Sequence, residues 1–272
     1  MKLKNLGKVY TLDSDNNFDL QKDITLSEDV MGFVNIILDY FREVVCIDIH
    51  SAYLRGSCLE RNVVDDDTLD IDVTIVYEND LSQSFTKVFT KECSNKIIKI
   101  MKSSYGFSIY PDVRIIHIDD FLKLSHVRFL SKKIYGKKDL SLSKISKSEM
   151  IDWIDERYDG WISRVIQYIR EDKRTLNHDD IRSDIKLFFR NFSIKLMVEN
   201  GEFSMNLNKC HKVMVENYPY YSDDLDDILN LFLNIEEYSK EKIITDLNKI
   251  ILFARSIQSK KLYCIKINKG RQ

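Results

Sequence analysis

Residues 69–77, LDIDVTIVY, constrain the fold of this chain more than any other segment. Valine, isoleucine, threonine and tyrosine are frequent in it, and these residue types favour β-strands. Successive side chains of a strand point to opposite faces, so Asp70 and Asp72 project from one face while the alternate apolar residues fill the other. The chain is therefore expected to build a sheet in which one face of this strand is covered by a hydrophobic core and the other carries an acidic pair.

The segments around this strand predict a small mixed α/β domain. Residues 26–45 carry apolar side chains at helical spacing, and residues 84–103 are expected to form a second helix. Residues 46–55 and 112–118 predict two further strands, the first of which breaks at a Gly-Ser turn. The order helix, strand, turn, strand, helix, strand indicates a mixed sheet with flanking helices that ends near residue 140.

The second half of the chain has a helical pattern only. It follows a lysine-rich segment, 134–148, which we interpret as an interdomain linker. Apolar stripes at helical spacing then occur in residues 150–170, 180–199, 225–232 and 243–254. The predicted fold class is thus an α+β domain, residues 1–140, followed by an all-α helical bundle domain, residues 149–272.

The composition limits the class of protein further. A chain of 272 residues can bury a core without disulfides, and its five cysteines are never closer than twelve residues, which excludes a CxxC zinc or redox motif. The N-terminus has no apolar leader core, and no window approaches the roughly eighteen apolar residues of a membrane span. We therefore expect a soluble, cytoplasmic protein with no membrane partner.

Charge is unevenly distributed along a chain whose net charge is only −2. Residues 60–80 contain eight acidic side chains and one basic one, whereas residues 131–148 contain six lysines and one acid. An enzyme that holds divalent cations in one place and polyphosphate in another could use this arrangement, because each cluster then has a counter-ion. The alternative is that both clusters are solvated loops.

The acidic pair suggests a specific chemistry. Asp70 and Asp72 would repel each other when ionised, and a hard cation such as Mg²⁺, which prefers oxygen ligands, removes the repulsion and can bridge to a triphosphate. Asp112, at the start of the third predicted strand, can complete a metal site or accept the proton of an attacking hydroxyl. Gly56 permits close backbone approach, and Ser57 offers a hydroxyl and an amide to phosphate oxygens.

These residues resemble a known motif. Gly56-Ser57, a gap of twelve residues, Asp70-Ile71-Asp72 and a later Asp112 are similar to the signature of the DNA polymerase beta-like nucleotidyltransferases. Within that superfamily the whole chain resembles two-domain bacterial proteins related to aminoglycoside adenylyltransferases. Residues 128–140, RFLSKKIYGKKDL, resemble their domain junction, and residues 186–219 resemble the helical stretch that packs over the nucleotide.

The resemblance implies roles for the acidic residues and the turn. Asp70 and Asp72 would bind one or two Mg²⁺ ions, Asp112 would be a third ligand or a base, and Gly56 with Ser57 would hold the phosphates of ATP or another NTP. The loop after this turn departs from the family, because Glu60, Arg61 and three aspartates stand where the family has a second glycine and a shorter gap.

The resemblance also suggests that Lys186 and Arg190, four residues apart on one helix, reach the triphosphate. A solvated helix face is the alternative for this pair. Trp153 and Trp161, with acidic residues around them, could line a pocket for a cationic acceptor or could be core anchors.

The function predicted from the sequence is Mg²⁺-dependent transfer of NMP, as AMP from ATP, to a hydroxyl of a small molecule such as an aminoglycoside, with release of pyrophosphate. Two alternatives stay open. One is the same transfer to tRNA, other RNA or protein, as in toxins. The other is a non-catalytic nucleotide-binding or antitoxin module with a toxin partner.

Overall fold

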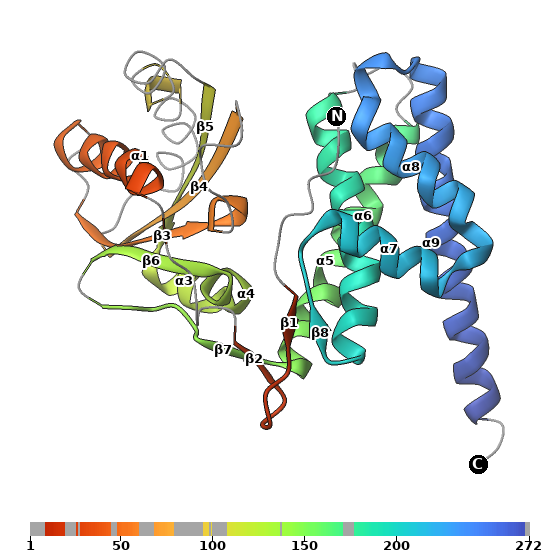
Figure 1. Cartoon of the computed structure of the whole chain (residues 1–272). Coiled ribbons are helices and arrows are strands. Elements are labelled where there is room, and N and C mark those ends of the chain that lie inside the picture. The colour runs from red at the N-terminus through yellow and green to blue at the C-terminus, as the bar shows by residue number, and fades with distance from the viewer. Residues whose placement is uncertain are drawn as a thin grey trace. The chain divides into compact units, whose positions relative to one another are not determined.

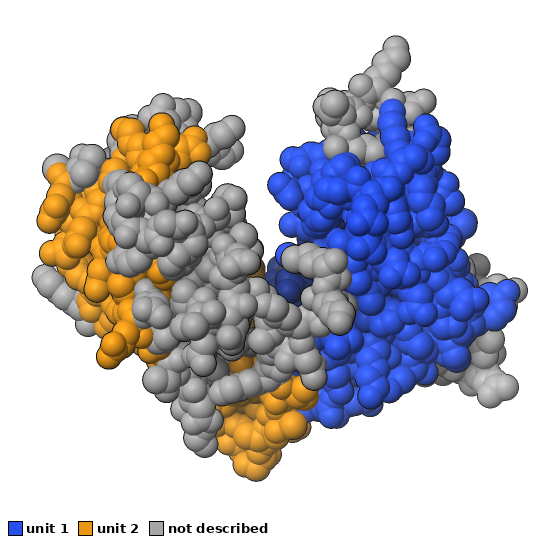
Figure 2. All heavy atoms as spheres, turned by 45° about the horizontal axis from the view of Figure 1, so that its top comes forward, with its two compact units in different colours: residues 1–5, 147–272 blue, residues 6–146 orange. Residues whose placement is uncertain are grey.

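The computed structural model describes residues 9–19, 26, 28–44, 48–59, 68–78, 95–97, 99, 108–136, 138–170 and 177–269. The chain divides into two compact units, residues 6–146 and residues 1–5 with 147–272 (Figure 2). Each unit has its own secondary structure and core.

The unit of residues 6–146 contains a mixed sheet with the strand order β5-β4-β3-β6 (Figure 1). Its strands are β3 (Ile49–Arg55), β4 (Thr68–Tyr77), β5 (Ser108–His117) and β6 (Ser131–Gly136). β4 is parallel to β5 and antiparallel to β3, and β3 is antiparallel to β6. The predicted strand of residues 69–77 is confirmed in the centre of this sheet.

Helices cover both faces of the sheet. They are α1 (Glu28–Asp39), which continues as a π-helical turn (Tyr40–Val44), and the short helices α3 (Ile118–Lys123) and α4 (Ser125–Phe129). On one face, Phe33 and Ile37 of α1 pack with Ile71 and Val73 of β4, and all four are at most 2% exposed. On the other face, the core consists of Tyr53, Val76, Phe121, Val127 and Leu140.

Two sequence expectations in this unit need correction. The strand predicted to begin at Asp112 begins at Ser108, so Asp112 lies inside β5 and Pro111 precedes it within the strand. Proline is tolerated there because β5 has only β4 as a neighbour among the described strands, which makes it an edge strand. Segment 134–148 is not simply a linker, because it supplies the end of β6 and the whole of β7 (Lys144–Ser146).

β7 pairs antiparallel with a short N-terminal strand, β2 (Asn17–Asp19), which β1 (Tyr10–Thr11) precedes. Asp13 organises the turn between β1 and β2. Its carboxylate accepts hydrogen bonds from the backbone amides of Asp15 and Asn17, and it also pairs with Lys144 of β7. The helix predicted for residues 84–103 lies mostly outside the described residues, of which 95–97 and 99 are helical.

The second unit consists mainly of helices. They are α5 (Lys147–Arg170), α6 (His178–Glu199), α7 (Leu207–Asn217), α8 (Ser222–Asn234) and α9 (Lys240–Lys269), with a short strand β8 (Glu202–Phe203) and 3-10 turns at Pro219–Tyr221 and Ile235–Glu237. Asn177 and Asn206 cap α6 and α7, because each side chain accepts a backbone N–H of the first turn. Along the described residues, none of the helices is long and apolar enough for a membrane span.

Aromatic rings fill much of the core of this unit. Trp161 of α5 stacks on Phe188 of α6, and Phe253 of α9 meets Phe188 and Phe192 edge to face. These contacts bring three helices together around one ring cluster, which fits the apolar stripes of the sequence.

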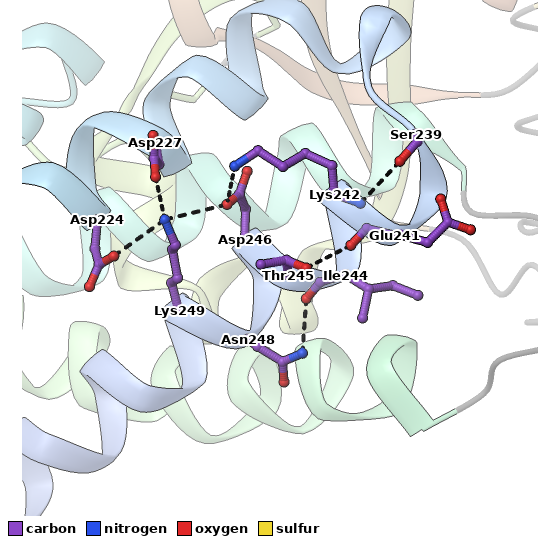
Figure 3. Close-up of polar contacts among 10 residues, drawn as sticks. All are labelled: Asp224, Asp227, Ser239, Glu241, Lys242, Ile244, Thr245, Asp246, Asn248 and Lys249. Atoms are coloured by element: carbon purple, nitrogen blue, oxygen red, sulfur yellow. Dashed lines mark hydrogen bonds and ion pairs between the residues drawn. The ribbon is translucent and has the colours of Figure 1, made fainter.

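An ion-pair network joins α8 to α9 in the same unit (Figure 3). Asp246 is fully buried and lies 3.0 Å from the ammonium of Lys242 and 3.6 Å from that of Lys249. Lys249 also contacts Asp224, at 3.3 Å, and Asp227. The hydrogen bond from Lys249 lowers the pKa of Asp227, so the Asp227 carboxylate is held in its charged form.

Candidate functional site in the mixed sheet

The strand register brings Asp72 and Asp112 together. β4 and β5 are parallel, and Asp72 is the register partner of Asp112. Residues paired across neighbouring strands present their side chains on the same face, and the strands lie about 4.8 Å apart. The two carboxylates are therefore neighbours on one face of the sheet, as a shared cation site requires.

Asp70 precedes Asp72 by two residues in β4 and pairs with Tyr110 of β5. Its backbone is extended, so position 70 shares a face of the strand with position 72. The position of the side chain itself lies outside the described residues. The predicted triad is thus represented by two described carboxylates and one described backbone position.

The acidic positions lie at one end of a face whose later part is buried on β3 and β4. Two residues along, Thr74 of β4 and its cross-strand partner Tyr53 are both 0% exposed, and burial raises the pKa of the Tyr53 hydroxyl. Asp72 is half-buried and Asp112 is exposed. The packing of α3 and α4 therefore covers the later part of this face, whereas solvent and solutes reach its acidic end.

The Gly-Ser turn lies directly against Asp72. Gly56 has φ +78° and begins a 3-10 turn, Gly56–Leu59, at the end of β3. A Cβ atom at this position would lie 2.2 Å from Oδ2 of Asp72, so any other residue would displace the turn or the carboxylate. Ser57 follows within this turn, and its side chain lies outside the described residues. The sequence motif thus corresponds to a direct contact between the turn and the acid.

The donor set fits a hard divalent cation. Carboxylate oxygens are the ligands that Mg²⁺ prefers, and two adjacent carboxylates need a cation between or beside them to offset their repulsion. Where side chains are described, no three Asp, Glu, His or Cys residues form a metal cluster, and Asp70 is not among those side chains. A third ligand at Asp70 therefore stays a prediction.

Sequence reasoning missed Arg55. It is the last residue of β3 and the antiparallel register partner of Asp72, so its side chain lies on the same face as both carboxylates. The signal was present in the sequence, because Arg55 directly precedes Gly56-Ser57 where β3 must end. Only the register of β3 against β4 shows that this arginine faces the acids.

Lys186 and Arg190 belong to the helical unit, where both have local contacts. Nε of Arg190 donates to the backbone oxygen of Met205 at 3.1 Å, and the Lys186 ammonium lies 5.6 Å from the ring centroid of Phe232. Both side chains are half-buried, so neither belongs to a fully solvated helix face. Their proposed contact with a triphosphate stays a prediction.

The tryptophans at the start of the helical unit lie in its core. Trp153 and Trp161 are 7% and 1% exposed, and the Trp161 indole N–H donates to the backbone oxygen of Asp184. Asp155 is held by Lys195 through hydrogen bonds of 2.6 and 2.7 Å. These contacts fit the interpretation as core anchors and do not support an open cationic pocket there.

Comparisons with known proteins give a likeness in structure but no match in sequence. No family model matches the sequence, and no curated protein matches it. Among solved structures, the spectinomycin adenyltransferase AAD(9) from Enterococcus faecialis, crystallised with ATP and spectinomycin, matches at 15% identity and a TM-score of 0.49. The match covers 82% of this chain and 99% of that chain. At this identity and TM-score the likeness transfers no chemistry, which has to be inferred from the residues of this chain.

Proposed function

We propose that this protein is a Mg²⁺-dependent nucleotidyltransferase that moves AMP from ATP to a hydroxyl group of a small molecule. Asp70, Asp72 and Asp112 would hold the metal, and the Gly56-Ser57 turn would contact the phosphates. The observation that carries the proposal is the cross-strand pair of Asp72 and Asp112, with the carboxylate of Asp72 against Gly56.

The proposed reaction breaks one phosphoanhydride bond. The acceptor oxygen attacks the α-phosphorus of ATP, the bond to the bridging oxygen breaks, and pyrophosphate leaves with that oxygen. The hydroxyl proton passes to a carboxylate or to water, for which Asp112 is suited because it is exposed at the edge strand. A bound Mg²⁺ supplies charge neutralisation for the attacking and leaving oxygens.

The fold contributes to the proposed reaction by positioning the two carboxylates. Asp72 is fixed between β3, β5 and the turn, so it needs little reorganisation when it binds a cation. The backbone of two paired strands holds Asp72 and Asp112 at a constant separation. The two carboxylates are therefore preorganised to bind a cation.

The acidic charge of the sequence segment that contains Asp70 and Asp72 favours a small acceptor over a nucleic acid. Residues 60–80, which include Asp70 and Asp72, carry eight acidic side chains and one basic one. The carboxylates of this segment repel the phosphates of an RNA backbone. ATP, in contrast, enters as its complex with a metal ion. A neutral or cationic small molecule meets no such barrier.

The test is transfer of label from α-³²P-ATP in the presence of Mg²⁺. Wild type, Asp72→Asn and a matched control, Asp39→Asn, are offered a panel of aminoglycosides and separate pools of small metabolites, RNA and protein. Asp39 is a suitable control because it is an exposed carboxylate of the same unit, 57% exposed at the end of α1.

We expect label in a small-molecule fraction with wild type and Asp39→Asn, and none with Asp72→Asn or after removal of Mg²⁺ by EDTA. Label only in RNA or protein would replace the proposed acceptor class. Full transfer by Asp72→Asn would refute the site, and no transfer by wild type with any NTP would refute the function.

A further inference from the structure

Three charged residues form a row across three neighbouring strands. Asp112 of β5 pairs with Asp72 of β4, and Asp72 pairs with Arg55 of β3. All three lie on one face, so two negative charges and then a positive charge follow one another from the edge strand β5 to β3. We propose that Arg55 neutralises Asp72 before a divalent cation binds and then binds the nucleotide triphosphate; this inference rests on the proposed function.

The first part follows from the charges of the row. Two carboxylates at directly paired positions repel each other, and an arginine opposite one of them offsets that repulsion. The guanidinium stays protonated in proteins, so its charge cannot be lost when its surroundings change. Arg55 therefore competes for Asp72 with any divalent cation, because both are attracted to the same carboxylate.

The second part follows from the position of Arg55. It directly precedes Gly56, whose Cα lies against the Asp72 carboxylate, so the arginine is one residue from the turn proposed to contact phosphates. Its side chain is half-buried, and its Nε atom is shielded from solvent. A guanidinium held in this way presents a planar set of donors that matches phosphate oxygens in two-pronged contacts.

Other arginine–carboxylate pairs of the chain differ from this row. Arg164 pairs with Asp184 at 2.9 Å, and Asp184 is buried, so that pair ties α5 to α6. Beside Arg55 the register places two carboxylates, Asp72 and the exposed Asp112, at neighbouring positions. A purely structural ion pair would not need the exposed second acid.

The two roles predict opposite effects of one substitution. Without the positive charge of Arg55, a divalent cation no longer competes for Asp72, so metal affinity in the absence of nucleotide should rise. The triphosphate loses a binding group, so nucleotide affinity should fall. A residue that only stabilised the sheet would weaken both, because it would loosen the strands that hold the ligands.

The test compares Arg55→Met, Arg55→Lys and the control Arg42→Met in the full chain. Arg42 is a half-exposed arginine of the same unit and pairs with Asp39 at 3.5 Å, away from the acidic row. Mn²⁺ affinity is measured by electron paramagnetic resonance without nucleotide. Affinity for the non-transferable analogue α,β-methylene-ATP is measured by calorimetry at saturating Mn²⁺, and thermal unfolding reports the fold.

For Arg55→Met we expect Mn²⁺ affinity to rise about fivefold and analogue affinity to fall about tenfold, in line with one charge at short range in a partly solvated site. Arg55→Lys keeps the charge, so its Mn²⁺ affinity should match wild type, while analogue affinity should fall because the two-pronged contact is lost. Arg42→Met should match wild type in both.

Lower or unchanged Mn²⁺ affinity in folded Arg55→Met would overturn the neutralising role, and unchanged analogue affinity would overturn the phosphate role. If Arg55→Met does not fold, Arg55→Lys decides, because wild-type analogue affinity in that variant would refute the two-pronged contact. If the Arg55 variants show the expected affinity shifts but wild type transfers no label from ATP, the proposed function is refuted and the charge row is supported.

Discussion

Replacing Gly56 with alanine probes the contact between the turn and Asp72. Gly56 has φ +78°, a backbone conformation that costs alanine about 1–2 kcal/mol. The added Cβ would lie 2.2 Å from Oδ2 of Asp72, whereas ordinary contacts begin at 3.4 Å. The carboxylate must therefore move by about 1 Å, because the backbone of the turn is less free to move than a side chain.

That displacement is large for a catalytic ligand. A misplacement of about 1 Å can reduce turnover on the order of 10²-fold, and productive sites hold their groups within roughly 0.5 Å. The variant should therefore lose about a hundredfold in nucleotide transfer and bind Mn²⁺ more weakly. Its free energy of unfolding should fall by only about 1–2 kcal/mol, the amount that the backbone strain supplies.

The assay measures label transfer per folded molecule, Mn²⁺ binding and denaturant unfolding for Gly56→Ala beside Gly136→Ala. Gly136 is a matched control in β6, with φ +103° and a hypothetical Cβ 2.4 Å from the backbone oxygen of His50. It should lose more stability, because a backbone atom must yield, yet keep its transfer rate per folded molecule. Wild-type transfer and Mn²⁺ affinity in Gly56→Ala would refute the contact between turn and acid.

Further predictions concern stability. Gly160→Ala in α5 should raise the free energy of unfolding by about 0.5–1 kcal/mol in denaturant, because a Cβ there meets no atom within 4 Å and helix interiors favour alanine. Lys249→Met should lower the free energy of unfolding by about 3 kcal/mol, because the buried Asp246 loses one of its two ammonium partners. The hydrogen bond to Lys144 lowers the pKa of Asp13 from 3.8 to about 2, so the charged carboxylate stabilises the fold above pH 4. Asp13→Asn should therefore lower the denaturation midpoint at pH 6. The difference from wild type should fade as the pH falls from 4 towards 2.

The sequence predicted best where one periodicity dominates. The strand expected at residues 69–77 is Thr68–Tyr77, because β-branched residues are frequent there. The helix expected at residues 180–199 is His178–Glu199, since its apolar stripe is long and the N-cap Asn177 defines its start. Ile71, Val73 and Ile75 of the strand are 0% exposed, and so are Ile185, Phe188 and Phe189 of the helix.

The sequence predicted poorly where long-range pairing decides. β6 and β7 lie in a lysine-rich segment with weak alternation, and they exist because β3 and β2 pair with them. The start of β5 was missed because Pro111 resembles a break, which an edge strand tolerates. Arg55 was missed because only the pairing register of β3 against β4 places it beside Asp72.

The two faces of β4 differ at the acidic end of the strand. Ile71, Val73 and Ile75 are 0% exposed and pack under α1, so this face of the strand belongs to the core, whereas the other face is buried at Thr74 and Val76 but not at Asp72. Asp72, on the other face, needs no packing of its own to stay in place, because its backbone is held by that core and by strands on both sides. This separation lets two like charges and an arginine meet at the solvent-accessible end of the sheet without weakening the hydrophobic layer beneath them.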